Sequence, residues 1–372
     1  MNRRTVLNLL SGALLSAAGP SGGARAASPL VSQQAPQRPG GVGRVLLGDG
    51  HLLLALALIH PDPIRFIAAW QGDLVRHSPE IVALYANRFP AAAAIPVVGE
   101  ASPDTFSVEA ALASAPEVAV LGGCYGPGPE DSAAVARLES AGIPVVFVDF
   151  YEDALNNTAP SMRLLGRLFG GAAQEKAEAF AAFHESRRAR IAERLAEAAP
   201  ARPTVLLQAH TGVSGWECCW MPGEAGLGRF VTAAGGASIS APLSATMPWV
   251  RGSLEYVLAS DPALVVTTGG PYLKGRRGLV IGPGIAADAA RRSLADVVAA
   301  SDIAPLTAVR QGRVRGLWHL LHATPLSIVA LEALASWFHP TLFADLDPAR
   351  TLAEINRDFL SVPLDGSFAV SL

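Results

Sequence analysis

The chain has 372 residues, enough for one or two folded domains. Half of the residues are hydrophobic and 16% are charged, a composition that supplies ample core and excludes a largely disordered chain. The formal net charge is −3 and the basic residues form only short pairs, which argues against nucleic acid as a partner.

The first 27 residues have the features of an export signal. Arg3 and Arg4 precede an apolar run from Val6 to Ala18, and Ala24-Arg25-Ala26 has the small-x-small form of a signal-peptidase site. The paired arginines predict the twin-arginine route. A membrane anchor is the disfavoured alternative, because the run is shorter than the roughly 20 residues that span a bilayer. Residues 28–43 are interpreted as a flexible leader, so we expect a periplasmic mature protein.

Residues 44–158 alternate between short apolar runs and amphipathic segments, which predicts an N-terminal α/β lobe with a mostly parallel sheet. The expected strands are 44–47, 95–98, 118–121 and 143–148. One expected helix begins at Leu52, and the others cover 79–88, 107–115 and 130–141. Gly48-Asp49-Gly50-His51 lacks the third glycine of a dinucleotide-binding motif, so we interpret it as a tight turn at the edge of a cleft.

A long helix, with a loosening at Gly170-Gly171 as an open alternative, is predicted for residues 159–198, where apolar residues mostly recur at three- and four-residue steps. No heptad register is sustained, which argues against a coiled coil. One helix of this length would extend roughly 50 to 60 Å, further than a small domain is wide. We therefore expect a linking helix with one lobe on each side.

The alternation restarts in residues 199–372, which we assign to a C-terminal α/β lobe with closing helices. The expected strands are 204–208, 263–268 and 313–317, and the expected helices are 227–234, 253–259, 325–338 and 348–360. A long loop covers 210–226. Residues 106–117 and 252–262 share a Ser-x-Glu helix before a buried strand, so the lobes should be alike. The predicted fold is α/β, with two Rossmann-like lobes of mostly parallel sheet joined by one long backbone helix.

The three cysteines are Cys124, Cys218 and Cys219. An oxidising compartment favours pairing, and the adjacent Cys218 and Cys219 could form only a vicinal disulfide. Shielded thiols are the alternative, and the one that we favour. The absence of a C-x-x-C spacing argues against a structural zinc site.

Ligand-binding side chains are expected where the C-terminal strand ends of both lobes face each other. They are Asp49, His51, Trp70, Tyr125, Phe150 and Tyr151 from the first lobe, and His210, Trp216, Trp220, Tyr272, Trp318 and His322 from the second. Arg251 and the run Lys274-Gly275-Arg276-Arg277 follow strand ends, where guanidinium groups could bind carboxylates or catecholates. A solvated loop is the alternative for these basic residues.

Several segments carry a resemblance through their order and spacing. They are Ser107-Val108-Glu109, Gly142-Ile143-Pro144-Val145-Val146, Ala234-Gly235-Gly236, Ser253-Leu254-Glu255 with Asp261-Pro262, and Leu306-Thr307-Ala308-Val309-Arg310-Gln311-Gly312-Arg313-Val314. Over roughly residues 44–360 the chain resembles the helical-backbone (class III) periplasmic solute-binding proteins of ABC importers, which serve ferric siderophores, haem and vitamin B12. The resemblance implies two lobes that close only slightly, a monomer, and no resident cofactor.

The resemblance also implies roles for single residues. Glu109 and Glu255 match the glutamates that dock each lobe on an ABC permease dimer. The alternative for either is a glutamate that only favours the helix dipole. Pro248-Trp249 before Ser253-x-Glu255 is similar in spacing to the vitamin B12 binding protein of the family, which implies that Trp249 covers the ligand.

The expected ligand is an iron chelate, in first place a ferric siderophore. Glu100, Ser102 and Asp104 stand where hydroxamate-binding relatives have an arginine, which argues against a hydroxamate. A haem or cobalamin carrier is the alternative, with Tyr125, Tyr151 or His322 as the axial ligand of haem. A bare metal ion would instead need a donor set such as His51, His210, His319 and His322 with Asp49.

An enzyme is the hypothesis of another class. Cys218 and Cys219 with His210 could form a thiol site, or a metal could be bound in the cleft. The sequence, however, shows no G-x-S-x-G elbow, no H-E-x-x-H motif and no defensible triad. We therefore expect a binding protein and no enzyme.

Overall fold

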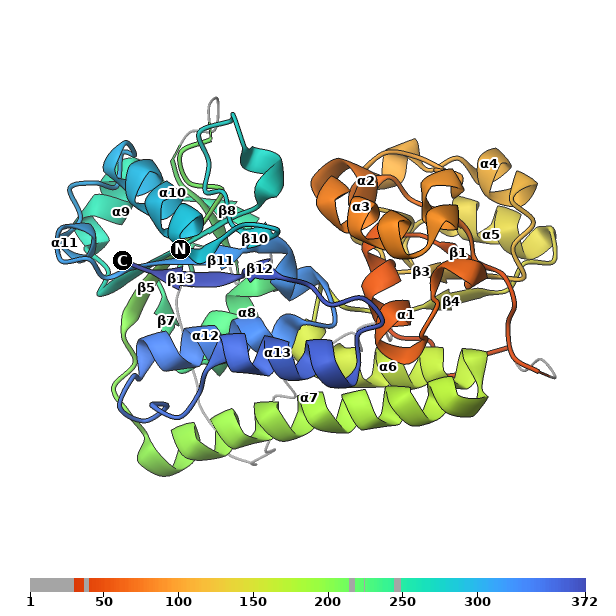
Figure 1. Cartoon of the computed structure of the whole chain (residues 1–372). Helices are drawn as coiled ribbons and strands as arrows, with labels where there is room; N and C mark the ends of the chain where they lie inside the picture. The colour runs from red at the N-terminus through yellow and green to blue at the C-terminus, as the bar shows by residue number, and fades with distance from the viewer. Residues whose placement is uncertain (1–29, 37–39, 214–217, 224, 244–248) are drawn as a thin grey trace, which may run out of the picture.

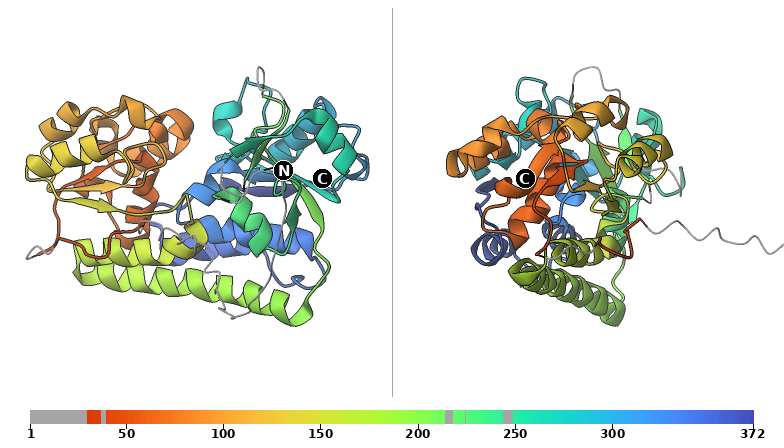
Figure 2. Two further views of the ribbon diagram at one scale, coloured as in Figure 1. Left: turned by 180° about the vertical axis from the view of Figure 1, so that it is seen from behind. Right: turned by 90° about the vertical axis from the view of Figure 1, so that its right-hand side faces the viewer.

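The structure, a computed structural model, describes residues 30–36, 40–213, 218–223, 225–243 and 249–372. The predicted signal peptide at 1–27 lies outside these ranges. Two α/β lobes lie side by side above one long helix, α7 (Gly171–Ala198) (Figure 1). Views from behind and from the side show the same arrangement (Figure 2). Within the described ranges, no helix combines the length and the apolar character needed to cross a membrane.

The first lobe is built on a four-stranded parallel sheet of order β2-β1-β3-β4. Its strands are β1 (Val45–Leu47), β2 (Ile67–Trp70), β3 (Val118–Leu121) and β4 (Val145–Phe147). The strand predicted at 95–98 is wrong, since only an isolated bridge joins Val97 to Trp70. Pro96 lacks an N–H group and cannot donate to a ladder. The edge position is instead filled by β2, which the sequence analysis did not predict.

Helices cover both faces of this sheet. They are α1 (Leu53–Ile59), α2 (Asp73–His77), α3 (Pro79–Arg88), α4 (Val108–Ala113) and α5 (Ser132–Ser140). Because side chains alternate along a strand, Val45 and Leu47 pack in the large core with α1, whereas Leu46 packs in a smaller core with residues of α4 and α5. Both faces are therefore buried, as a parallel sheet requires.

The predicted helix at 159–198 is two helices. α6 (Ala154–Phe169) ends at Gly170, whose φ of 69° and ψ of −173° break the helix, and α7 begins at Gly171 with φ of 51°. Glycine adopts positive φ at little cost, so the chain reverses here. α6 then lies against α7, where Arg163 pairs with Glu178 at 2.8 Å and Glu185 at 2.7 Å. The long backbone helix is thus confirmed as α7, but its predicted start was wrong.

The second lobe contains a five-stranded sheet of order β13-β11-β9-β5-β7. The parallel strands are β5 (Thr204–Ala209), β7 (Ala237–Ser238), β9 (Leu264–Gly269) and β11 (Val314–Trp318); β13 (Ala369–Ser371) is an antiparallel edge strand. The helices are α8 (Leu227–Ala233), α9 (Leu254–Ser260), α10 (Ala287–Ala299), α11 (Thr307–Arg310), α12 (Ser327–Phe338) and α13 (Pro348–Asp358). Neither α10 nor α11 was predicted from the sequence.

Two small antiparallel sheets complete this lobe. β6 (Trp220–Pro222) pairs with β8 (Trp249–Arg251), and β10 (Gly282–Pro283) pairs with β12 (Gly366–Ser367). The first of these pairs, the β6–β8 ribbon, arises from the loop that we predicted at 210–226 and from residues just before α9. It carries two tryptophans of the site described below.

The predicted likeness of the lobes appears in two matching helix starts. Ser107 caps α4 by accepting a hydrogen bond from Ala110 N at 3.1 Å, and Ser253 caps α9 by accepting one from Tyr256 N at 3.2 Å. Each cap is followed two residues later by an exposed glutamate, Glu109 or Glu255. Both helices lie on the side of their lobe that faces away from α7 (Figure 1).

Candidate ligand-binding pocket

A pocket of about 770 Å³ lies between the lobes. It is lined by Cys124, Tyr125, Tyr151, Ala209, His210, Trp220, Trp249, Arg251, His319, His322 and Ala323. These residues come from the segments after β3, β4, β5 and β11 and from the β6–β8 ribbon. The pocket thus lies at the C-terminal strand ends of both sheets, as a switch point in an α/β fold predicts.

The segment that carries Tyr125 is fixed by Asp49. The carboxylate accepts hydrogen bonds from Gly126 N at 3.0 Å and from Tyr125 N. Burial, followed by the nearby charge of Asp73, raises the pKa of Asp49 to about 6. Asp49 therefore supports the pocket wall from behind, and it lines only a cavity of about 20 Å³ next to the main pocket.

His51 is also a supporting residue. Its Nδ1 lies 2.5 Å from Asp73 Oδ2, and its Nε2 lies 3.0 Å from Ser78 Oγ. Both ring nitrogens are thereby engaged inside the first lobe. The expectation that Asp49 and His51 face the ligand is corrected, since hydrogen bonding to their own lobe uses these groups.

Tyr151 is positioned by a buried carboxylate at the end of β4. Asp149 accepts hydrogen bonds from the backbone N–H groups of residues 151, 152 and 153 at 2.8, 2.8 and 2.9 Å, and from Asn157 Nδ2 at 2.7 Å. Trp249 Nε1 donates to the hydroxyl oxygen of Tyr151 at 3.1 Å. This bond joins the β6–β8 ribbon of the second lobe to the segment that leads from the first lobe into α6.

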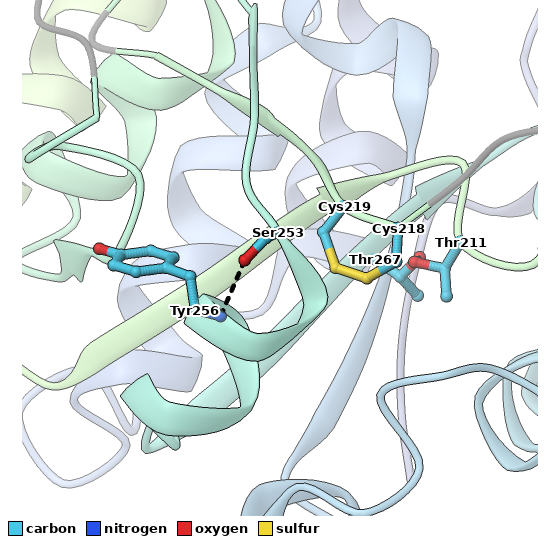
Figure 3. The surroundings of a disulfide bond; sticks show 6 residues. All are labelled: Thr211, Cys218, Cys219, Ser253, Tyr256 and Thr267. Atoms are coloured by element: carbon cyan, nitrogen blue, oxygen red, sulfur yellow. Dashed lines mark hydrogen bonds between the residues drawn. A yellow bond between two sulfur atoms is a disulfide. The ribbon is translucent and has the colours of Figure 1, made fainter.

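The β6–β8 ribbon connects the pocket to the region around Glu255. Trp220 stands opposite Arg251, and Cys219 exchanges two backbone hydrogen bonds of 3.0 Å with Gly252. Cys218 and Cys219 form a disulfide next to the Ser253 cap of α9, with Thr211 and Thr267 nearby (Figure 3). The vicinal disulfide is thus the correct alternative for this pair, and the shielded thiols that we favoured are wrong here. Cys124 remains a free thiol.

Three histidines from two segments gather on the second-lobe side of the pocket. The ring centroids of His210 and His319 lie 4.4 Å apart, and those of His319 and His322 lie 4.9 Å apart. His319 Nδ1 lies 2.9 Å from Thr268 Oγ1, and His322 Nδ1–H donates to the carbonyl oxygen of His319. Burial, and for His210 and His319 also neighbouring imidazoles, lowers the three pKa values, to about 4 for His210 and His322. The three rings are therefore neutral at neutral pH.

Other predicted residues lie outside the pocket. Trp70 and Trp318 are 1% and 0% exposed, so both belong to the core and cannot cover a ligand. Arg276 and Arg277 are exposed and are not part of the lining. Tyr272 lies next to the lining, where its hydroxyl is 2.6 Å from His210 Nε2. The predicted Trp216 lies outside the described residues.

His77 is a residue near the pocket that the sequence analysis missed. Its ring centroid lies 5.3 Å from Tyr125 of its own lobe and 5.4 Å from Tyr272 of the other lobe. It follows no strand directly, which is why the strand-end argument could not find it. Its position at the end of α2 next to η5 (Pro271–Leu273) makes it part of a contact between the lobes.

The described residues contain no group of three or more His, Cys, Asp or Glu side chains that could hold a metal ion. Burial, followed by the charges of nearby carboxylates, raises the pKa of the Cys124 thiol well above its usual value. The thiol is therefore protonated, which disfavours nucleophilic chemistry at this position.

Acidification should destabilise the fold through these histidines. The pKa of His322 is about 4 in the folded protein and 6.5 in the unfolded chain, so the unfolded chain binds the proton more tightly. The contribution of His322 to the free energy of unfolding is fully present above pH 6.5. It falls by about 3 kcal/mol as the pH drops from 6.5 towards 4, and then levels off. Asp49 has the opposite effect: because its pKa is raised to about 6 in the folded protein, its protonation below this pH favours the folded state.

Chemical denaturation of the wild type and of His322→Gln at several pH values measures this effect. The difference in unfolding free energy between the two proteins should change between pH 6.5 and 4, because Asp49 contributes equally to both. A difference that is independent of pH over this interval would contradict the prediction.

Comparison of the sequence with known proteins found a family match and a relative. A family model described as periplasmic binding protein matches residues 73–318. A cobalamin-binding protein of Halobacterium salinarum is 26% identical over 263 residues, which is 70% of this chain and 63% of that relative. The match thus spans less than two thirds of the relative's length.

Solved structures give the same picture of the fold. The TroA-like periplasmic binding protein FepB from Veillonella parvula superimposes with a TM-score of 0.79 at 22% identity, over 90% of this chain and 96% of that one. The periplasmic heme-binding protein RhuT from Roseiflexus sp. RS-1 gives a TM-score of 0.56 at 18% identity, over 81% and 100%. At these identities the likeness concerns the fold.

Proposed function

Because the chain belongs to the periplasmic binding protein family, which serves ABC transporters, we propose that it captures a metal chelate between its lobes and delivers it to an importer. The chemistry of the pocket lining is the observation that carries this proposal. Four aromatic side chains, Tyr125, Tyr151, Trp220 and Trp249, surround a space that also contains neutral imidazoles. Flat apolar rings suit the organic part of a chelate, and imidazole suits its metal.

The pocket favours a tetrapyrrole chelate over a polyanionic siderophore. The siderophore hypothesis depended on several arginines. Among the described residues the lining contains one arginine, Arg251, whereas Arg276 and Arg277 are exposed and do not belong to the lining. A catecholate complex of high negative charge would need more cationic groups than the lining offers. We therefore place haem or a corrinoid first and a ferric siderophore second. The 26% identical relative that is named a cobalamin-binding protein supports this order.

Titration of tryptophan fluorescence tests the proposal. Haemin, cyanocobalamin, a ferric triscatecholate and a ferric trihydroxamate are added separately to the mature protein. We expect saturable quenching at one equivalent by a tetrapyrrole. Saturation by the triscatecholate alone would keep the transport role and reverse the order of ligands. Absence of quenching by all four would refute the proposal.

Trp249→Phe should weaken tetrapyrrole binding up to about tenfold, because the indole stacks on His319 and holds Tyr151 by a hydrogen bond. Trp337→Phe on α12, a tryptophan that is not part of the lining, is the matched control. Equal affinities of the two variants would argue against Trp249 as a wall of the site.

Delivery should use the exposed glutamates of both lobes. Glu109 and Glu255 each follow a serine cap at the start of a helix, and these two helices, α4 and α9, lie on the side of their lobe away from α7 (Figure 1). We propose that each docks on one subunit of a permease dimer and that the protein acts as a monomer. Export to the periplasm is assigned to the twin-arginine signal proposed for residues 1–27.

A further inference from the structure

We infer that His319 supplies an imidazole nitrogen to the metal of the bound chelate, so that the pocket selects chelates with a free or exchangeable coordination position. This inference rests on the proposed function, since it concerns the cargo of the same pocket. It adds a residue that the strand-end argument did not select for the chelate. It also predicts that the pocket distinguishes ligands by whether their metal has an open coordination position, and not by their shape alone.

One ring nitrogen of His319 is accessible. Among the described residues, His319 Nε2 has no hydrogen-bond partner, yet it is not sealed off from solvent, and the residue lines the pocket. His322 Nε2 also lacks a partner but is fully buried. His210 Nε2 is 2.6 Å from the hydroxyl of Tyr272. Of these three Nε2 atoms, that of His319 is therefore the one offered to a ligand.

The imidazole ring of His319 is also held in place. Thr268 is fully buried at the end of β9, and its Oγ1 lies 2.9 Å from Nδ1 of His319. When Nδ1–H donates to this oxygen, Nε2 carries the lone pair. On the other side, the Trp249 ring stacks at a centroid distance of 5.7 Å and an interplanar angle of 29°. A fixed tautomer and a fixed ring plane are the requirements for a metal donor.

The number of protein donors differs between a bare metal ion and a metal chelate. A bare transition-metal ion needs about four protein ligands, and the described residues offer no such group. A single presented nitrogen can instead complete the coordination of a metal that brings its other ligands with it. A hexadentate complex has no position for this nitrogen, whereas an iron porphyrin or an aquated corrinoid has one. The structure thus assigns the cargo to the second kind.

Two pairs of probes test the selection for an open coordination position. Within each pair the ring system is the same: haemin against its bis-cyanide complex, and aquocobalamin against cyanocobalamin. The wild-type protein should bind the open member of at least one pair at least about 10-fold more tightly, because even the loss of an outer-shell partner of a metal ligand costs about 10- to 100-fold in metal affinity. Equal affinity within both pairs would overturn the inference, although the proposed function would stand. Failure of these probes and of the ferric siderophores to bind would overturn both.

Variants identify the donor. With the preferred open probe, His319→Ala should remove the difference within the pair and change the absorption spectrum of the metal centre. Added imidazole should restore that spectrum. Thr268→Val should produce a smaller change, because it removes only the partner of Nδ1. His60→Gln, at the end of α1 between Phe66 and Phe169, is the histidine control. A His319→Ala spectrum and selectivity identical to those of the wild type would overturn the assignment.

Discussion

Replacing Glu109 and Glu255 together by alanine should abolish uptake of the ligand and leave its binding affinity unchanged. Both side chains are exposed and neither belongs to the lining of the pocket, so their loss removes no contact to the ligand. Each is an exposed negative group at the start of a helix, suited to a cationic site on a permease. Uptake is measured in cells that contain the cognate importer, and affinity is measured by fluorescence titration.

The single variants should differ, because the two glutamates have different surroundings. Arg137 lies 2.5 Å from Glu109 and, ahead of the other causes, lowers its pKa. Among the described residues, no cationic group lies within ion-pair distance of Glu255. Docking through Glu109 must therefore exchange one partner for another, whereas docking through Glu255 need not. We expect Glu255→Ala to impair uptake more strongly, and Arg137→Ala to have little effect on the affinity for the ligand.

Two outcomes would contradict the docking proposal. Unchanged uptake in the double variant would show that other residues contact the permease. Loss of ligand affinity in the double variant would mean that the glutamates act on the fold or the pocket instead. Replacement of Glu193, an exposed residue of α7, by glutamine provides a control for a general change in surface charge.

Arg187→Met should lower the free energy of unfolding by about 3–5 kcal/mol, the typical cost of leaving one member of a buried ion pair without its partner. Arg187 on α7 donates to Glu332 on α12 at 2.9 Å and to Thr351 on α13 at 3.1 Å, and it also pairs with Glu354. Glu332 is 1% exposed. The variant would leave its carboxylate buried with Thr351 as its remaining partner.

Two further variants make the test specific. Arg190→Met, on the same helix, breaks a pair with Asp345 in which the side chains are 41% and 49% exposed, so we expect a loss below about 1 kcal/mol. Combining Arg187→Met with Glu332→Leu removes both charges and should recover part of the lost stability. Denaturant unfolding measures all three. A loss in Arg187→Met no larger than in Arg190→Met would refute the role of this pair.

The result bears on how the lobes can move. α7 packs on α1 of the first lobe and on α12 of the second, and one apolar core runs through these helices into both lobes. Further contacts cross between the lobes near the pocket, among them those between Trp249 and Tyr151 and between His77 and Tyr272. Ligand capture should therefore need only small movements, because a large rotation would open this core.

Periodicity and order along the chain were sufficient to predict the architecture. Alternating strands and helices predicted two parallel sheets, and the repeated Ser-x-Glu helix start predicted matching lobes. The resemblance stated from these segments is confirmed by the family match over residues 73–318. These features are local, since a strand, a cap or a turn is specified by neighbouring residues. The location of the pocket at the strand ends followed from the same pattern.

Tertiary structure decided which side chains line the pocket. Trp318 and His319 are adjacent, but Trp318 closes β11 with its ring in the core and His319 begins the next segment in the pocket. A shift of one residue at a strand end reverses the side to which a side chain points, and the sequence does not define strand ends that closely. The reversal at Gly170 was likewise decided by packing, because the helical periodicity continues on both sides of it while α6 folds back on α7. The sequence by itself determined the lobes and their strand ends, and contacts between distant segments selected the residues of the site.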